Sequence, residues 1–273
     1  QLRVDQFDAE RFVLFATRQG RTKKVSLDQF SRPKKKGIIA IKLNKGDSLI
    51  GASLCSPGQE VVLGTRGGMA IRFDEQDVRP MGRAAAGVGG SGLREEDEVV
   101  DMAILDPSQE GITLLTACSN GFGKRTRFQD YRRQKRNGSG IISIKTSERN
   151  GPVVGLKAVR EEDDVVLMSQ EGLVMRMQAT DISLMGRATQ GVKMMNLKEG
   201  DALASLARVA QAEDVEEEEV STGGVEQGAE RKYVGAAVQI GDRTRLLLGR
   251  HEAGGARHGA KAGLPSQIPL CSY

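Results

Sequence analysis

Closely spaced cationic side chains are the groups in this sequence best suited to bind a ligand. Arg132, Arg133, Lys135 and Arg136 stand within five positions, directly before a glycine-containing turn and an apolar run. A track of cations can neutralise the phosphates of a nucleic acid and release counterions without reading any base. A lone basic cluster, in contrast, is usually a solvated face. The interpretation therefore depends on whether the cluster recurs.

The cluster does recur, because four segments of the chain share one pattern. An arginine stands four residues before a glycine in three repeats, and the first repeat carries four cations in the same, shorter connection. These loop cations are Arg32, Lys34, Lys35, Lys36, Arg83, Arg132, Arg133, Lys135, Arg136 and Arg187. A second set, the hairpin cations, follows an earlier glycine by four residues in every repeat: Lys24, Arg72, Arg125 and Arg176.

The two sets of cations support different interpretations. The loop cations favour nucleic acid, because like charges cluster there against their own repulsion. The hairpin cations fit phosphate binding and an ion pair with an Asp of the next repeat equally well. No aromatic side chains interleave with the cations, which argues against stacking on single strands. We therefore predict contacts to the phosphate backbone of a duplex.

The sequence gives little support for a metal site, a disulfide framework, a nucleotide site or a membrane span. Cys55, Cys118 and Cys271 lie far apart, and residues 1–210 contain no histidine, so neither a usual zinc spacing nor a disulfide framework is present. A reducing cytoplasm fits this composition best. The sequence has no Gly-x-x-x-x-Gly-Lys-Ser/Thr segment, so we expect no nucleotide cofactor and no metal. No apolar run approaches the roughly 18 residues that span a bilayer, and we expect no membrane partner.

The repeats extend over about residues 12–55, 59–107, 111–159 and 163–210. Each turns at a first glycine, and these glycines are 48, 53 and 51 residues apart: Gly20, Gly68, Gly121 and Gly172. A second glycine follows at Gly37, Gly87, Gly140 and Gly191, and ten residues later stands Asp47, Asp97, Asn150 or Asp201. Agreement at three offsets in four copies indicates a repeat architecture.

Each repeat reads as four short strands, so we predict an all-β fold of propeller blades. Val61–Thr65 and Met69–Phe73 flank a glycine turn, which is typical of a hairpin. The segment after Gly140 alternates, which predicts Ile142 and Ile144 on one face and Ser143 and Lys145 on the other. In the second repeat, "GVGGSGL" is too rich in glycine to predict a firm third strand.

The distribution of charge divides the chain into a basic part and a tail that begins with an acidic segment. Residues 1–210 hold 33 of the 40 Lys and Arg residues and 26 of the 36 Asp and Glu residues, a net charge of +7. Residues 211–230 read as an acidic linker or tail, which either competes with DNA for the cations or only adds solubility. From residue 231 to 273 the bias toward Gly, Ala and Arg predicts a disordered or non-native tail.

The phrases "GFGKRT", "GIISIKTSERNGPVVGL", "MGRATQGVKMMNL" and "KGDSLIGASL" resemble the C-terminal domain of bacterial DNA gyrase A, over residues 12–210. The resemblance implies a β-pinwheel, a propeller-like disc of six blades that exchange strands and wrap DNA around a basic rim. We count four blades, and because the chain begins at Gln1 rather than Met we expect a fragment, with two blades before Gln1. In the family a Gln-Arg-Arg-Gly-Gly-Lys-Gly box normally lies in the first blade. Here "QKRNGSG" matches that box only in part and lies in a different blade.

The resemblance also implies partners and a location. They are double-stranded DNA, the rest of gyrase A, and gyrase B, which joins gyrase A in a heterotetramer, in the bacterial cytoplasm at the nucleoid. The catalytic tyrosine, ATP and Mg²⁺ belong to other parts of that type II topoisomerase, so this chain alone is not expected to be an enzyme. The equivalent domain of topoisomerase IV and a protein-binding propeller stay open as alternatives.

The count of four blades predicts an open arc with two unpaired edges. With no outer neighbour for the first repeat, we expect Val13, Phe15 and the adjoining apolar positions to lose packing partners. The arc should still fold, because the stability of a repeat protein is roughly a sum of unit and nearest-neighbour terms.

Overall fold

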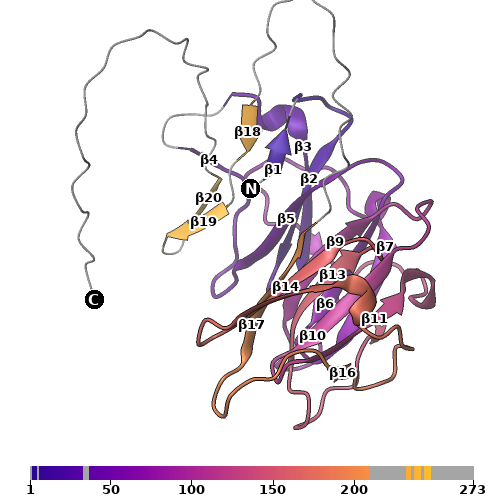
Figure 1. Ribbon diagram of the computed structural model, residues 1–273. Helices are drawn as coiled ribbons and strands as arrows, with labels where there is room; N and C mark the ends of the chain where they lie inside the picture. Colours follow the sequence, from indigo (N-terminus) through magenta and orange to yellow (C-terminus); the bar gives the residue numbers. More distant parts are fainter. Residues whose placement is uncertain are drawn as a thin grey trace, which may run out of the picture.

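The computed structural model describes residues 2–4, 6–32 and 37–209, and the backbone of residues 232–234, 237–240 and 243–246. All regular elements in these residues are β-strands or single turns of 3-10 helix, as predicted. Four blades follow one another in chain order, from the indigo and purple first blade to the orange fourth (Figure 1). No helix in the described part of the chain is long and apolar enough to cross a membrane.

Every repeat contributes four strands. The first gives β2 (Phe12–Thr17), β3 (Arg21–Ser26), β4 (Ile38–Ile39) and β5 (Leu49–Cys55). The second gives β6 (Glu60–Thr65), β7 (Met69–Asp74), β8 (Val88–Gly89) and β9 (Val99–Leu105). The third gives β10 (Thr113–Cys118), β11 (Phe122–Arg127), β12 (Ile141–Ile142) and β13 (Val153–Val159). The fourth gives β14 (Asp164–Ser169), β15 (Val174–Gln178), β16 (Val192–Lys193) and β17 (Leu203–Val209).

A short turn of 3-10 helix follows the second strand of each repeat. These turns are η1 (Leu27–Phe30), η2 (Glu75–Asp77), η3 (Phe128–Asp130) and η4 (Ala179–Asp181). Each turn follows the hairpin and precedes the loop that carries the loop cations. The loop then leads to the third strand of the repeat.

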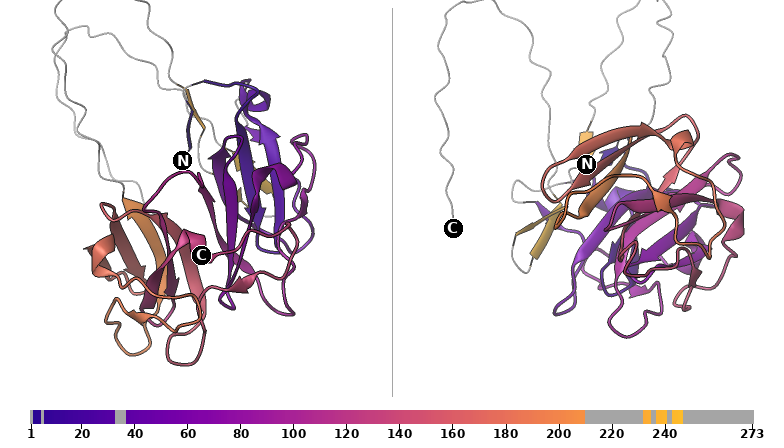
Figure 2. Two further views of the ribbon diagram at one scale, coloured as in Figure 1. Left: turned by 90° about the vertical axis from the view of Figure 1, so that its right-hand side faces the viewer. Right: turned by 60° about the horizontal axis from the view of Figure 1, so that its bottom comes forward.

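The blades exchange strands, because the third strand of a repeat pairs with the preceding blade. The sheets of the first three blades have the orders β5-β2-β3-β8, β9-β6-β7-β12 and β13-β10-β11-β16. Among the described residues the fourth blade has the three strands β17-β14-β15. The inner strands β5, β9, β13 and β17 pack against their neighbours in that order, so the exchanged strands lie on the outer side. β5 and β17 do not pack in this way within the described residues, and the arc is open (Figure 2).

The core lies between neighbouring blades and is aliphatic. Both faces of the hairpin strands in the first three blades are largely covered, and β6 and β10 are buried along their whole length. This double burial explains why those strands read as continuous apolar runs rather than alternating ones. One cluster, for example, joins Leu14 of the first blade to Leu63 and Phe73 of the second.

The acidic residue ten positions after the second glycine fastens the turn of its own hairpin. The Asp97 Oδ1 atom accepts hydrogen bonds from the Gly67 N–H (2.8 Å) and the Glu98 N–H (2.9 Å). The carboxylates of Asp47 and Asp201 accept equivalent bonds from the turns of the first and fourth repeats. The recurrence of this residue is therefore structural, since it satisfies turn N–H groups that would otherwise lack partners.

The predicted alternation after Gly140 is wrong. Only Ile141 and Ile142 form the strand, after which the chain bends. Ser143 and Ile144 are both buried, and Ile142 is the exposed residue. The bend arises because the Ser143 and Ile144 N–H groups both donate to the Gly68 carbonyl oxygen of the preceding blade (2.8 and 3.2 Å). The glycine-rich third strand of the second repeat, β8, has the same two-residue length as the others.

The expectation that Val13 and Phe15 lose partners is also wrong. Both side chains are fully buried in a cluster with Val4 and with Ile38 of β4. The N-terminal segment and the third-strand region of the first repeat cover this face of the first blade. The edge without an exchanged strand, within the described residues, is β15 of the fourth blade.

Three further strands lie in the tail. β18 (Lys232–Val234) pairs with β1 (Leu2–Val4), and β19 (Ala237–Ile240) pairs with β20 (Arg243–Leu246), which pairs with β4. The rest of residues 210–273 lies outside the described residues. The acidic linker and the disordered or non-native tail therefore stay predictions.

Candidate nucleic-acid interface

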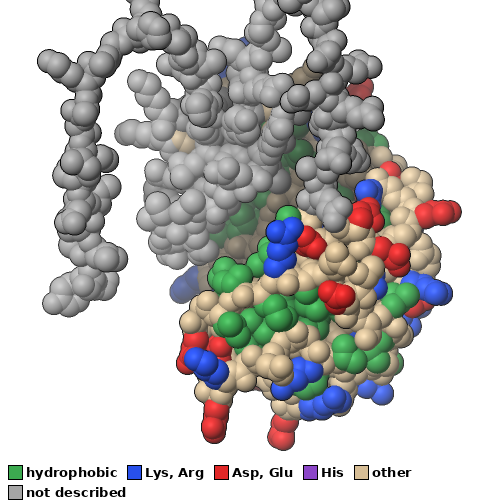
Figure 3. Space-filling model, viewed as in Figure 1, with side chains coloured by type: hydrophobic (Ala, Val, Ile, Leu, Met, Phe, Trp, Pro, Cys, Tyr) green, Lys and Arg blue, Asp and Glu red, His purple; other side chains and the backbone are tan. Residues whose placement is uncertain are grey.

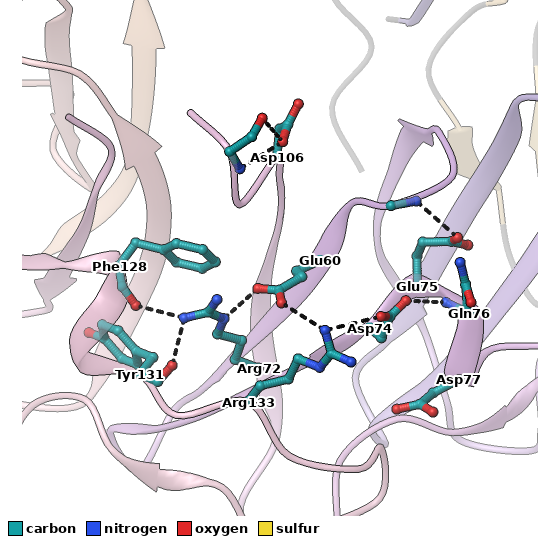
Figure 4. Close-up of polar contacts among 12 residues, drawn as sticks. Glu60, Arg72, Asp74, Glu75, Gln76, Asp77, Asp106, Phe128, Tyr131 and Arg133 are labelled. Carbon is teal, nitrogen blue, oxygen red and sulfur yellow. Dashed lines mark hydrogen bonds and ion pairs between the residues drawn. The ribbon is translucent and has the colours of Figure 1, made fainter. Parts of the chain in front are cut away.

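Two of the hairpin cations lie between neighbouring blades and bind protein groups. Lys24 is buried and its ammonium group pairs with the Glu75 carboxylate of the next repeat, with the Glu75 carbonyl oxygen 3.1 Å away. Arg72 pairs with Glu60 of its own hairpin and donates to the carbonyl oxygens of Phe128 (3.2 Å) and Tyr131 (2.9 Å). Figure 4 shows this guanidinium between the carboxylate and the two carbonyls.

The other two hairpin cations differ in exposure. Arg125 is buried, and its Nε–H donates to the Ile182 carbonyl oxygen at 2.9 Å. Arg176 pairs with Asp164 of its own hairpin, and its side chain is 66% exposed. Among the described residues, pairing with an acid of the next repeat thus holds for Lys24 and not for Arg72, Arg125 or Arg176. Lys24, Arg72 and Arg125 are occupied in the junction between blades, which leaves Arg176 as the hairpin cation most open to a ligand.

The loops that carry the loop cations lie along the outer edge of the preceding blade. The N–H groups of Met81, Gln134 and Met185 donate to the carbonyl oxygens of the preceding hairpin cation, Lys24, Arg72 and Arg125 respectively (2.8–2.9 Å). The same position of each loop is therefore attached to the same position of the neighbouring blade. The spacing of the loops follows the spacing of the blades.

Arg136 and Arg187 fasten the exchanged strands. The Arg136 guanidinium donates to the carbonyl oxygens of Asp77 and Gly89, both at 2.9 Å, and Gly89 belongs to β8. Arg187 donates to the carbonyl oxygen of Ile142 in β12 at 3.0 Å. Each arginine therefore links its own loop to the strand exchanged by the previous repeat. Both side chains are half-buried and keep part of their surface open.

The cluster around residue 132 is the most exposed group of cations. The Lys135 side chain is 89% exposed, with its Nζ atom 2.9 Å from Asp77. Arg133 is 59% exposed and lies 3.6 Å from Glu60 and 3.3 Å from Asp74 (Figure 4). Arg132 is exposed as well. Because surface ion pairs contribute little, these partners do not prevent the cations from meeting phosphates.

The first two loops are described in part. Arg32 is exposed, whereas Lys34, Lys35 and Lys36 lie outside the described residues. Arg83 is half-buried, and its carbonyl oxygen accepts a hydrogen bond from the Lys23 ammonium group.

Exposed lysines beside the exchanged strands were not predicted from the sequence. Lys42 and Lys145 are exposed, and their N–H groups donate to the Ala85 and Thr189 carbonyl oxygens in the loop of the next repeat. Each therefore lies beside a loop that carries an arginine. Both stand five residues after the second glycine, a spacing that could have revealed them. Lys193 of β16 is exposed at a nearby position.

The surface is not uniformly basic. On the face in Figure 3, Lys and Arg side chains are interspersed with Asp and Glu, and hydrophobic side chains gather over the fourth blade. The fourth repeat supplies five of the exposed large hydrophobic residues in the described part of the chain: Met168, Leu173, Val174, Leu184 and Val209. No group of three His, Cys, Asp or Glu side chains in that part could hold a metal ion.

A family model described as the DNA gyrase C-terminal domain, beta-propeller, matches residues 11–56, 59–106, 113–160 and 163–210. Each matched segment lies on one repeat. The chain is 44% identical over 228 residues to DNA gyrase A of Chlamydia pneumoniae, which covers 83% of the chain and 27% of the relative. It is 42% identical over 229 residues to the gyrase A of Klebsiella oxytoca, and this match covers 84% of the chain and 26% of the relative. The chain thus spans about a quarter of the length of these relatives.

Solved structures agree with the architecture. A structure of the DNA gyrase A C-terminal domain superposes with a TM-score of 0.68 at 29% identity, covering 75% of this chain and 68% of that one. The C-terminal domain of DNA topoisomerase IV superposes with a TM-score of 0.71, covering 76% of this chain and 64% of that one. Its identity of 23% supports the shared fold alone.

Proposed function

The chain belongs to the DNA gyrase C-terminal domain family, and on this premise we propose that residues 1–210 bind double-stranded DNA along the outer side of the arc and wrap it. The supporting observation is the repeated attachment of a cation-bearing loop to the outer edge of the preceding blade. Exposed or half-buried loop cations then recur in every repeat, which suits the regular phosphates of a duplex. The proposed contacts come from the loop cations and from Arg176, Lys42, Lys145 and Lys193.

The proposal extends to the protein of which this domain is part. The domain presents a wrapped DNA segment to the cleavage core of gyrase A, which works with gyrase B in a heterotetramer during ATP-dependent negative supercoiling. The domain itself carries no chemical step and needs no nucleotide or metal of its own. Its place is the bacterial cytoplasm at the nucleoid.

Salt dependence tests the proposed binding mode. With about six phosphate contacts, the logarithm of the binding constant should fall with the logarithm of salt concentration with a slope of about −5. Replacing Arg132 and Lys135 with Ala should make that slope shallower by about 2, because two phosphate contacts are lost. Both side chains are exposed, so the substitutions should leave the fold unchanged. The control is Lys198→Ala, which removes a cation from an exposed turn outside the loops. Binding that ignores salt, or prefers one sequence by orders of magnitude, would contradict the proposal.

A further inference from the structure

One position that is buried in the first three blades carries different residue types in the four repeats. The third residue after the first glycine is Lys23 in the first repeat, Ile71 in the second, Lys124 in the third and Met175 in the fourth. Lys23 and Lys124 are both fully buried. Since apolar residues occupy the same place in the other two blades, the fold itself does not require a cation there.

Both buried lysines bind the loop of the following repeat. The Lys124 ammonium group donates to the carbonyl oxygens of Gly186 and Arg187, the latter at 2.6 Å. The Lys23 ammonium group donates to the Arg83 carbonyl oxygen and, at 2.7 Å, to that of Ala40. Each lysine therefore holds the backbone of the arginine that stands four residues before the second glycine.

The surroundings leave these ammonium groups with carbonyl partners rather than a carboxylate. No salt bridge joins Lys23 or Lys124 to an acid within the described residues. Burial without an opposite charge disfavours the charged form. Desolvation accordingly lowers the pKa of Lys23 to about 8, helped by the nearby Arg83. It lowers the pKa of Lys124 to about 8 as well, helped by Arg187 and opposed by Cys118 and Asp130.

We propose that Lys23 and Lys124 are positioning residues for duplex binding, which hold the Arg83 and Arg187 loops on the outer side of the arc and add a charge there that varies with pH. The inference rests on the proposed function. A bound phosphate would stabilise the ammonium form, so DNA binding and protonation of the lysines favour each other. Deprotonation above neutral pH removes a positive charge behind each loop and weakens phosphate binding.

Variants taken from the other blades test this inference. Lys23→Ile and Lys124→Met introduce the residue types that the same position carries in the second and fourth repeats, so the fold should tolerate them. A unit charge about 10 Å from a phosphate changes affinity about threefold, at an effective dielectric constant of about 20 and with the screening of about 0.1 M salt. We expect duplex affinity of the wild-type protein to fall by that factor per lysine between pH 7 and pH 9 at constant salt. In the double variant the duplex affinity at pH 7 should already be lower than that of the wild-type protein. It should also change less between pH 7 and pH 9.

The matched control is Lys198→Met, which should keep the pH profile of the wild-type protein. A second measurement needs no variant: at pH 8 the binding enthalpy of the wild-type protein should depend on the ionisation enthalpy of the buffer, because DNA binding takes up protons. Cys118 does not interfere, since burial raises its pKa to about 12.

The outcomes separate this inference from the proposed function. If the wild-type protein binds no duplex at pH 7, both are overturned. If it binds duplex with the expected salt slope but takes up no protons at pH 8, the inference alone fails. The same holds if the folded double variant keeps the wild-type affinity and pH profile.

Discussion

Arg72 is held from two sides, by Glu60 in its own hairpin and by the carbonyl oxygens of Phe128 and Tyr131 in the next repeat. Its guanidinium also stacks on the Phe128 ring, 3.8 Å from the centroid. A planar group with five N–H donors suits such a junction, which an ammonium group could not fill in the same way. The arginine therefore joins two blades.

Replacing Arg72 with Ala should lower the free energy of unfolding by about 3 kcal/mol, because it leaves the buried Glu60 carboxylate without its main partner. Replacing Arg176, the exposed residue at the same position of the fourth repeat, should cost less than about 1 kcal/mol. Denaturant unfolding measures both. A stable Arg72→Ala protein with weakened DNA binding would instead make Arg72 a phosphate ligand.

At the scale of the element, the exchanged strand is the unit that joins one blade to the next. The first glycine of every blade adopts a positive φ, and in the first three blades its carbonyl oxygen accepts two N–H groups from the chain that follows the exchanged strand. In the third blade the Met194 and Met195 N–H groups bind the Gly121 carbonyl oxygen at 2.8 and 3.1 Å. In the fourth blade no described residue other than the two chain neighbours of Gly172 lies within 4 Å of where its Cβ would be.

Gly121→Ala and Gly172→Ala therefore form a matched pair. Both force alanine into a positive φ, at 78° and 85°, which costs about 1 kcal/mol. Only at Gly121 would the new Cβ also meet the Met195 carbonyl oxygen. We expect Gly121→Ala to destabilise the protein by at least about 1 kcal/mol more, because overpacking adds to the strain. Equal unfolding midpoints would show that the exchanged strand contributes little to stability.

At the scale of the whole molecule, the fourth blade accepts no exchanged strand within the described residues. Leu173 and Val174, which follow Gly172 directly, are 46% and 54% exposed. In the other blades the residues at these positions pair with β8, β12 or β16. An open strand edge with apolar side chains favours pairing with another strand.

A chain extended before Gln1 by two further repeats of the family should fill this edge and close the arc. We expect a higher melting temperature, slower amide hydrogen exchange in β15 and a linking-number change when bound circular DNA is ligated. Each effect follows from added nearest-neighbour contacts and from a continuous outer rim. If residues 1–273 alone change the linking number as much as the extended chain does, four blades suffice for wrapping.

Much of the blade architecture could be predicted from the sequence, because it depends on local and periodic features. The first glycines mark hairpin turns that need a positive φ, and the apolar runs between them have strand length. The sequence also predicted that the cluster around Lys135 belongs to a recurring basic loop, since cations stand at that place in every repeat.

The tertiary structure alone decided which blade each third strand completes and which cations remain open. β12 pairs with β7, about seventy residues earlier, and nothing in its two apolar residues specifies that partner. Lys24 and Arg125 carry the same charge as Lys135, yet strand exchange encloses the first two between blades. Local sequence sets the type of each residue and the turns around it, whereas burial depends on contacts between segments far apart in the chain.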